Sequence, residues 1–121
     1  EYLGNLQPVP SPALVNGDLS ESAKRGKVVF DLASCSDCHA GDFLTDGKRH
    51  NVGTGTGREN DKPWDTPTLR EIWRTAPYLH DGRANTLNDV IGPANPQDRH
   101  GETSTLSDEQ RRDLVEYLRS L

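Results

Sequence analysis

Two cysteines and a histidine stand close together in the sequence, in the order Cys35-Ser36-Asp37-Cys38-His39. The pattern C-x-x-C-H is typical of sites where a c-type haem is bonded covalently to the protein. One helical turn between the two thiols would let both reach the vinyl groups on one edge of the porphyrin, and the next residue would direct its imidazole at the iron. The sequence therefore predicts a single haem c attached through Cys35 and Cys38, with His39 as the first axial ligand.

Other uses of paired cysteines fit this sequence less well. A thioredoxin-type redox pair needs a βαβ context, which the chain does not show. A structural zinc site needs about four ligands, and the sequence offers the two cysteines no second paired motif but only His50, His80 and His100. A disulfide across two intervening residues would cross-link almost nothing. Covalent haem attachment is therefore the favoured chemistry.

The composition agrees with a domain that holds a cofactor in its core. The length of 121 residues suggests one domain, and only 31% of the residues are apolar. Such a polar chain buries little side-chain surface to offset its ordering entropy, and a large, flat, apolar haem would supply part of the missing core. The formal net charge of −5 argues against a nucleic-acid partner.

Further features bear on the cellular compartment. No run of residues approaches the ~18 apolar positions of a membrane span, so no transmembrane segment is predicted. The sequence begins at Glu1 and contains no methionine, which suggests a processed or excised piece. Covalent haem attachment of this kind takes place outside the cytoplasm. We therefore expect a bacterial periplasmic or extracellular protein that is exported before haem attachment.

The chain is predicted to consist of one domain preceded by a short irregular segment. Residues 1–19 contain prolines at positions 8, 10 and 12, a spacing that favours an extended path. We expect residues 1–19 to form a linker or an N-terminal strap laid over the domain. Residues 20–121 are expected to form the haem domain itself.

Amphipathic helices are predicted at both ends of this domain. Ser20 should cap a first helix that ends near Leu32, and Ser107 and Gln110 form a capping box for the last helix. Apolar residues recur at helical spacing in the last helix. Gly26 lies in the middle of the first helix, where a glycine usually lets another backbone come close. We therefore expect the two helices to cross at Gly26.

Loops are predicted to make up most of the region between these helices. Residues 40–65 are rich in glycine and show little periodicity. A middle helix should begin at Thr66 and Pro67 and end before Pro77, and a short helix should begin at Thr86. No segment shows a strand-like alternation of any length. The sequence therefore predicts an all-α protein.

The second axial ligand of the iron is left open by these patterns. Methionine is absent, which excludes His/Met ligation and should lower the reduction potential relative to a His/Met site. The iron could also have no second protein ligand. The candidate side chains are His50, His80, His100, Tyr78 and Lys62.

From about residue 10 to its end, the chain resembles the C-terminal haem domain of the bacterial dihaem cytochrome c peroxidase and MauG superfamily. The most specific segment is Thr-Ala-Pro-Tyr-Leu-His-Asp-Gly at residues 75–82. The resemblance implies a class I cytochrome c-like fold, with crossed N- and C-terminal helices around one covalently bound haem and long loops between them. The other segments that carry the resemblance are residues 26–30, 35–39, 43–47, 50–55, 65–70, 86–87, 100–101 and 106–107.

The resemblance also indicates which residues contact the haem. In these relatives the distal ligand, a methionine or a tyrosine, comes from a segment that corresponds here to residues 95–101. His100 is the only strong ligand in that segment, so the resemblance implies His100 as the distal ligand, with His80 as the second candidate. Arg70, Tyr78 and His80 are expected to contact the haem or its propionates. Further candidates for such contacts are Trp64, Trp73 and Arg83.

The predicted function is electron transfer by this one haem, with His39 proximal and His100 distal. The peroxide-reacting haem of the relatives belongs to their other domain, so a self-sufficient peroxidase is not expected. The predicted partner is a redox protein or a fused redox domain. One alternative is an open-site haem protein that reacts with or senses oxygen, peroxide or carbon monoxide. Another is a domain whose haem mainly supports folding and docking within a larger polypeptide.

Overall fold

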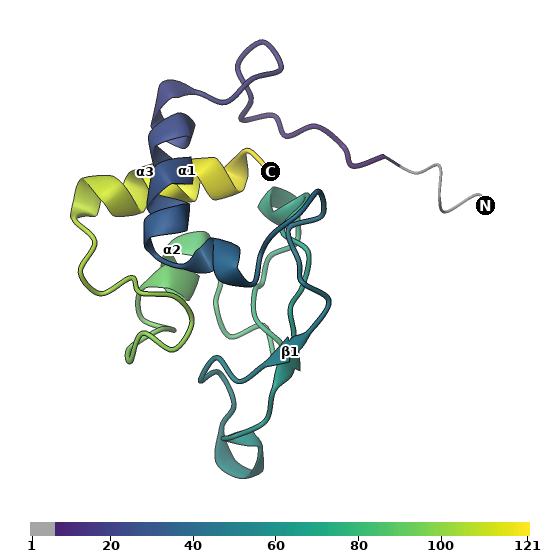
Figure 1. The fold of residues 1–121 in the computed structure, drawn as a ribbon, viewed down its shortest axis with the longest axis vertical. Helices are drawn as coiled ribbons and strands as arrows, with labels where there is room; N and C mark the ends of the chain where they lie inside the picture. The colour runs from purple at the N-terminus through teal and green to yellow at the C-terminus, as the bar shows by residue number, and fades with distance from the viewer. Residues whose placement is uncertain (1–6) are drawn as a thin grey trace.

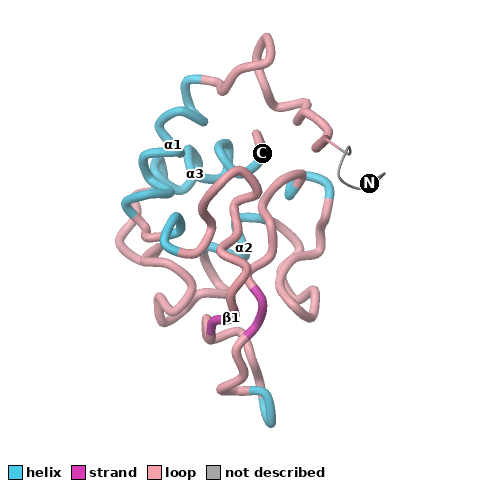
Figure 2. Tube along the Cα trace, turned by 45° about the vertical axis from the view of Figure 1, so that its right-hand side comes forward, coloured by secondary structure: helices cyan, strands magenta, loops and turns pink. Residues whose placement is uncertain are grey.

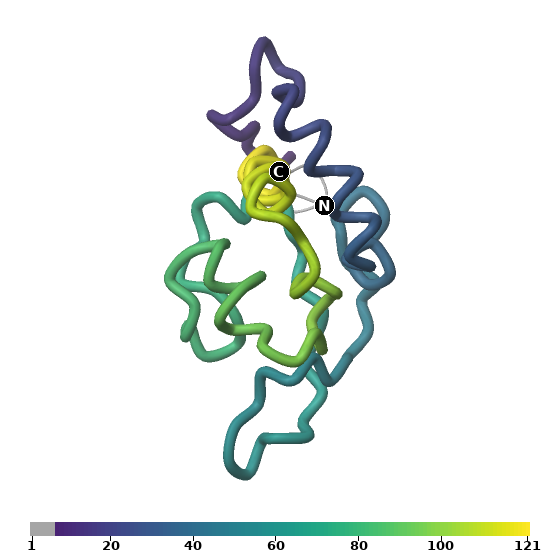
Figure 3. The backbone as a smooth tube through the Cα atoms, turned by 90° about the vertical axis from the view of Figure 1, so that its left-hand side faces the viewer, coloured from purple at the N-terminus to yellow at the C-terminus, as the bar shows by residue number. Residues whose placement is uncertain are grey.

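The α-helices lie toward one end of the molecule, and a loop with a single 3₁₀ turn reaches the far end (Figure 1). The computed structural model describes residues 7–121. Within this range the loops dominate the trace, as Figure 2 shows. In Figure 1 and Figure 3, α1 and α3 lie together, and the teal loop near residue 55 lies at the far end. The helices and strands are α1 (Glu21–Leu32), β1 (Arg49–His50), β2 (Trp64–Asp65), α2 (Leu87–Ile91) and α3 (Asp108–Arg119).

The first and last helices begin where the capping residues predict. The Ser20 hydroxyl accepts a hydrogen bond from the backbone N–H of Ala23, as expected of an N-cap. Ser107 and Gln110 form the predicted capping box, in which each side chain accepts from the backbone N–H of the other residue. These local signals account for the start of both helices.

The two long helices cross at Gly26, as predicted. A Cβ atom built on Gly26 would lie 1.8 Å from the carbonyl oxygen of Asp113 and 2.8 Å from the Cβ of Tyr117. No side chain larger than hydrogen fits there without separation of the helices. Phe30, one turn further along α1, meets the ring of Tyr117 edge-on at a centroid distance of 5.3 Å. The core beneath this crossing includes the fully buried Leu114.

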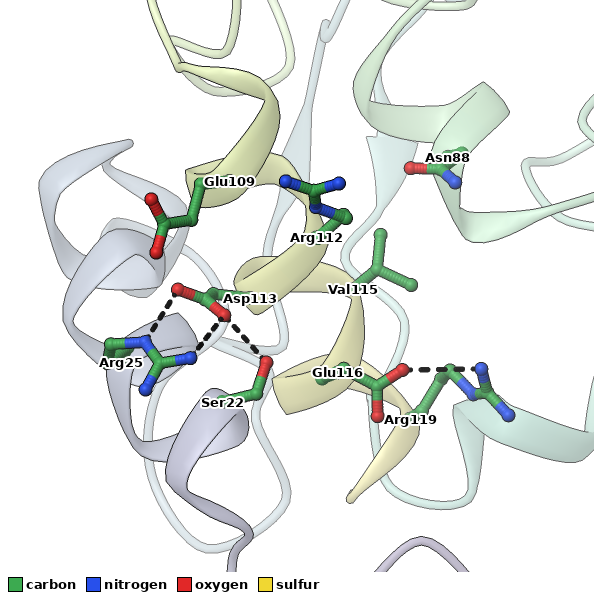
Figure 4. Close-up of a pocket in the computed structure, with 9 residues that line it drawn as sticks. All are labelled: Ser22, Arg25, Asn88, Glu109, Arg112, Asp113, Val115, Glu116 and Arg119. Atoms are coloured by element: carbon green, nitrogen blue, oxygen red, sulfur yellow. Dashed lines mark hydrogen bonds and ion pairs between the residues drawn. The ribbon is translucent and has the colours of Figure 1, made fainter.

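Asp113 ties the two helices together beside the crossing (Figure 4). Its carboxylate accepts a hydrogen bond from the Ser22 hydroxyl at 2.6 Å and two from the Arg25 guanidinium, at 2.9 and 3.2 Å. The Asp113 side chain is 8% exposed, whereas that of Arg25 is 58% exposed. The hydrogen bonds from Arg25 and Ser22 hold the pKa of Asp113 below its ordinary value.

Replacing Asp113 with asparagine should lower the free energy of unfolding by about 1 kcal/mol at pH 7, because charge-assisted hydrogen bonds to a shielded group are lost. The stabilisation is complete above the unfolded-state pKa of about 4 and is lost as the pH falls through the lower folded-state pKa. Denaturant unfolding of both proteins should therefore show a gap that narrows below pH 4. The control is Glu116→Gln, which breaks a more exposed pair with Arg119. A gap that persists unchanged at pH 2 would contradict the assignment.

Between α1 and α3 the structure differs from the sequence-based expectation in two places. The helix predicted from Thr66 is wrong, because the segment forms only a 3₁₀ turn at Ile72–Arg74. The Thr68 hydroxyl donates to the carbonyl of Phe43, and Glu71 has a left-handed backbone with φ 63°. These long-range contacts hold the segment in an irregular path. The all-α expectation also missed β1 and β2, whose two-residue strands are too short to show an alternation.

The segment before α1 contacts the C-terminal half of the chain. The backbone N–H of Val9 donates to the Glu71 carboxylate at 2.6 Å, and the buried Ser11 hydroxyl donates to the carbonyl of Arg119. Residues 1–6 of the predicted strap lie outside the described range. The division of the chain at residue 20 stays a prediction. Among the described residues, none of the helices has the length and apolar character needed to cross a membrane.

Candidate haem-binding site

The two cysteines are brought onto one short turn directly after α1. Ser34 ends the helix with a left-handed backbone, φ 66°, and a 3₁₀ turn follows at Cys35–Asp37. The Cys35 carbonyl accepts hydrogen bonds from the backbone N–H groups of Cys38 at 3.3 Å and His39 at 2.9 Å. The chain thus makes the single helical turn that the spacing predicts, and neither cysteine is in a disulfide.

The surroundings of the thiols do not favour thiolate chemistry. Burial raises the pKa of Cys35 to about 11 and also raises that of Cys38. A redox-active cysteine needs the opposite shift, toward the thiolate. Asp37 and Asp46 carry negative charge near these thiols and raise their pKa values further. This argues against the thioredoxin-type alternative.

The His39 ring is oriented by the turn that follows it. Its Nδ1 lies 3.0 Å from the carbonyl oxygen of the buried Leu44, and since that oxygen can only accept, Nδ1 carries the proton. The other ring nitrogen, Nε2, then presents its lone pair, which is the arrangement that metal-binding histidines use. Burial lowers the pKa of His39, which keeps the ring neutral, as a ligand must be.

The fold brings the ring of His100 close to that of His39, although the two residues are far apart in the sequence. The two ring centroids are 6.4 Å apart and the ring planes differ by 47°. Two imidazoles on opposite sides of one metal ion have centroids about 6 Å apart, because each metal–nitrogen bond is about 2 Å and each ring nitrogen lies about 1 Å from its ring centre. Burial, together with the nearby His39, lowers the pKa of His100 to about 4. The spacing of these two neutral rings therefore fits a haem iron between them.

The loop that carries His100 lies directly on the segment that leads into the cysteine turn. The backbone N–H of Glu102 donates to the carbonyl of Ala33 at 2.9 Å. A Cβ atom on Gly101, which has φ +81°, would lie 3.1 Å from the same carbonyl and 3.6 Å from the Sγ of Cys35. The two halves of the candidate site are thus held together by backbone contacts.

His80 packs against a tryptophan in the structure. Its ring stacks on that of Trp64 with centroids 3.7 Å apart and planes 14° apart, and its side chain is 15% exposed. The Lys62 ammonium lies 4.5 Å from the centroid of the Trp64 ring. The indole N–H groups of Trp64 and Trp73 are buried without a hydrogen-bond acceptor. Such donors normally have a partner, and a haem propionate is a group that could supply one.

Tyr78, Arg70 and His50 make contacts with other parts of the protein. The hydroxyl of the buried Tyr78 donates to the carbonyl of Ile72 at 3.0 Å. Arg70 donates from Nε to the carbonyl of Asp42 at 2.8 Å. Asp42 lies three residues after His39 in the sequence. His50 lies 2.6 Å from the Asp46 carboxylate through Nε2. Roles for Arg70, Tyr78 and His80 at a haem stay predictions.

The groove between α1, α2 and α3 in Figure 4 is separate from these residues. It is lined mainly by charged side chains of α1 and α3, including Arg25, Asp113 and Glu116. None of its lining residues belongs to the cysteine turn or to the loop of His100. Of its ion pairs, Arg25–Asp113 joins the two crossing helices, whereas Glu116–Arg119 lies within α3.

Sequence reasoning missed the polar residues that shape the loop of His100. The buried Asn95 contacts the backbone of this loop, and Asp98 accepts hydrogen bonds from the backbone N–H groups of Thr103 and Ser104, both at 3.0 Å. Arg111 of α3 donates to the carbonyl of Thr103 at 2.7 Å. The only signal for them in the sequence was the presence of Asn and Asp, which favour loop hydrogen bonds, near a candidate ligand.

Comparison with known proteins assigns this chain to a family. Residues 23–121 match the sequence model of the family "Cytochrome c". The chain therefore belongs to the cytochrome c family, which implies covalently bound haem c and haem-based electron transfer. It also resembles proteins related to the dihaem peroxidases and MauG, as the sequence motifs indicated.

Three relatives give the extent of this similarity. The gamma subunit of hydrazine synthase from Kuenenia stuttgartiensis is 51% identical over 61 residues, which are 50% of this chain and 17% of that subunit. The methylamine utilization protein MauG of Methylophilus methylotrophus is 31% identical over 93% of this chain and 41% of its own length. A solved structure of Kuenenia stuttgartiensis hydrazine synthase superposes with a TM-score of 0.87 at 33% identity, covering 99% of this chain and 52% of the other. The chain thus spans less than half the length of the curated relatives that it matches.

Proposed function

We propose that this chain is an electron-transfer domain with one haem c, attached through Cys35 and Cys38 and held between His39 and His100. The observation that supports this most directly is the 6.4 Å distance between the two imidazole centroids, which suits two axial ligands of one iron. The proposal includes a class I arrangement, in which the crossed helices α1 and α3 support the haem site.

The protein residues have distinct tasks in this proposal. The haem supplies a one-electron couple between ferric and ferrous iron. The bond from His39 Nδ1 to the Leu44 carbonyl holds the proximal ring in one tautomer and orientation. His100 would close the opposite side, so that outside molecules cannot reach the iron. Trp64 and Trp73 would offer their unpaired indole N–H groups to propionates, and Arg70 would add positive charge nearby.

The electron is proposed to pass to a redox partner protein or to a fused redox domain, in a bacterial periplasmic or extracellular location. The named relatives include a subunit of an enzyme, hydrazine synthase. This chain matches only part of their length. We therefore assign to this chain the delivery of electrons, and not the chemistry of a whole enzyme.

The proposal predicts a low-spin optical spectrum in both oxidation states and no rapid spectral change when carbon monoxide is added to the reduced protein. The reason is that two firm imidazole ligands leave no open position for the gas, which can bind only as slowly as one of them dissociates. Absorbance of the haem relative to protein should also give one haem per chain. A high-spin spectrum, or a rapid shift on addition of the gas, would contradict the proposal and favour an open-site protein that binds oxygen, peroxide or carbon monoxide.

A further inference from the structure

We propose that Asn95 is a positioning residue that holds His100 in place as a firm axial ligand, an inference that rests on the proposed ligation by His100. Asn95 lies just after α2, at the start of the irregular loop that carries His100. Its side chain points into this loop, and the residue is only 5% exposed. Its hydrogen bonds are therefore shielded from bulk water.

The Asn95 side-chain amide makes hydrogen bonds to both backbone groups of His100, its N–H and its carbonyl. The Oδ1 atom accepts from the His100 backbone N–H at 2.9 Å, and Nδ2 lies 3.0 Å from the His100 carbonyl oxygen and 2.9 Å from that of Gly101. The first contact fixes the orientation of the amide, because a backbone N–H can only donate. Within residues 7–121, neither the N–H nor the carbonyl of His100 has a backbone hydrogen-bond partner. The Asn95 side chain takes over the task that a helix or strand would otherwise perform.

The remaining contacts of this loop anchor its far end. Nδ2 of Asn95 also lies 2.9 Å from the hydroxyl oxygen of Thr103, which is 1% exposed. The Thr103 carbonyl accepts from Arg111 at 2.7 Å, and its backbone N–H donates to Asp98 at 3.0 Å. The Thr103 backbone is thus held by the side chains of Arg111 and Asp98. The Asn95 side chain differs from the Thr103 hydroxyl, because Asn95 bonds directly to the backbone of His100.

The consequence concerns how firmly the imidazole stays in place. The apparent affinity of a ligand on a loop is proportional to the fraction of time that the loop spends in the conformation able to bind. The Asn95 bonds limit those conformations, and their loss would leave buried backbone groups unpaired in the closed form. The open form of the loop, in which His100 has moved away, would then be more populated. Asn95 acts through His100 and needs no contact of its own with the haem.

The test is the rate at which carbon monoxide replaces the internal ligand of the reduced holoprotein, measured by stopped-flow absorbance. Asn95→Ala should raise this rate roughly 10- to 100-fold, the effect of losing one or two buried hydrogen bonds. Asn95→Ser, which can keep one bond, should give a smaller increase and serves if the alanine variant does not fold. The matched control is Thr103→Val, which removes only the hydroxyl from the same buried cluster. It should lower thermal stability while leaving the rate within about twofold of the wild type.

The outcomes separate positioning from a merely structural role. An increased rate in the Asn95 variants but not in Thr103→Val supports the inference. An unchanged rate in Asn95→Ser and Asn95→Ala, or an equal increase in Thr103→Val at equal loss of thermal stability, overturns it. His100→Ala tests ligation by His100 separately from positioning by Asn95. If that variant leaves the rate unchanged, the proposed ligation by His100 fails; if it opens the iron and the Asn95 variants do not, only the role of Asn95 fails.

Discussion

Replacing His100 with alanine should leave His39 as the only protein ligand and convert the reduced protein into one that binds carbon monoxide. The expected result is a change from a low-spin to a high-spin spectrum and full formation of the carbon monoxide complex. The physical reason is that alanine has no group that could take the position of an imidazole, and within residues 7–121 the ring of His100 is the histidine ring found 6.4 Å from that of His39. Optical titration with the gas measures the effect.

His80→Ala is the matched control for this experiment. His80 was the second candidate for the distal ligand, but its ring stacks on Trp64 at 3.7 Å. Its removal should therefore leave the spectrum low-spin and the reaction with the gas as slow as in the wild type. The opposite pair of results would assign the distal position to His80: His100→Ala keeps the low-spin spectrum, and His80→Ala becomes high-spin and binds the gas. If both variants stay low-spin, neither histidine is the distal ligand.

A methyl group at Gly26 should destabilise the fold by about 3 kcal/mol, although alanine favours helices over glycine by up to about 1 kcal/mol. The new Cβ atom would lie 1.8 Å from the carbonyl oxygen of Asp113 and 2.5 Å from its carbonyl carbon. Both are backbone atoms, so no side-chain rotation relieves the clash and the two helices must separate. Denaturant unfolding of the haem-loaded protein measures the loss.

The control is Lys27→Ala, because Lys27 is the next residue on α1 and is exposed. Its effect on the free energy of unfolding should be within about 0.5 kcal/mol. If Gly26→Ala is as stable as the wild type, or more stable, the helices pack less closely than the structure indicates. Helix propensity would then outweigh the contact with Asp113.

Local signals in the sequence predicted those parts of the fold that depend on local interactions. Ser20, Ser107 and Gln110 mark helix starts through hydrogen bonds that span only three residues, and the structure contains them. Gly26 predicted the helix crossing because a glycine in a helix has few other uses. The two-residue spacing between the cysteines predicted a single helical turn, and that turn is present.

The features that were missed depend on contacts between distant residues. Nothing local marks Thr68 as the donor to Phe43, 25 residues earlier, and this contact helps to keep the segment after Pro67 from forming the expected helix. The hydrogen bonds from Asn95 to the His100 backbone were missed for a similar reason. Asparagines occur in many loops, and the sequence does not show which one is buried. His100 itself was indicated by its place in a family pattern, whereas its closeness to His39 is a property of the folded chain.

The carbonyl group that orients His39 also bears on how charge moves through the site. A carboxylate in the place of the Leu44 carbonyl could take the proton from Nδ1 when the iron becomes oxidised. A backbone carbonyl is too weak a base to do so, and the 3.0 Å bond therefore keeps the proton on the ring in both states. In the proposed site, an electron could therefore arrive or leave on the His39 side without a proton moving with it, and His39 would not make electron transfer dependent on pH.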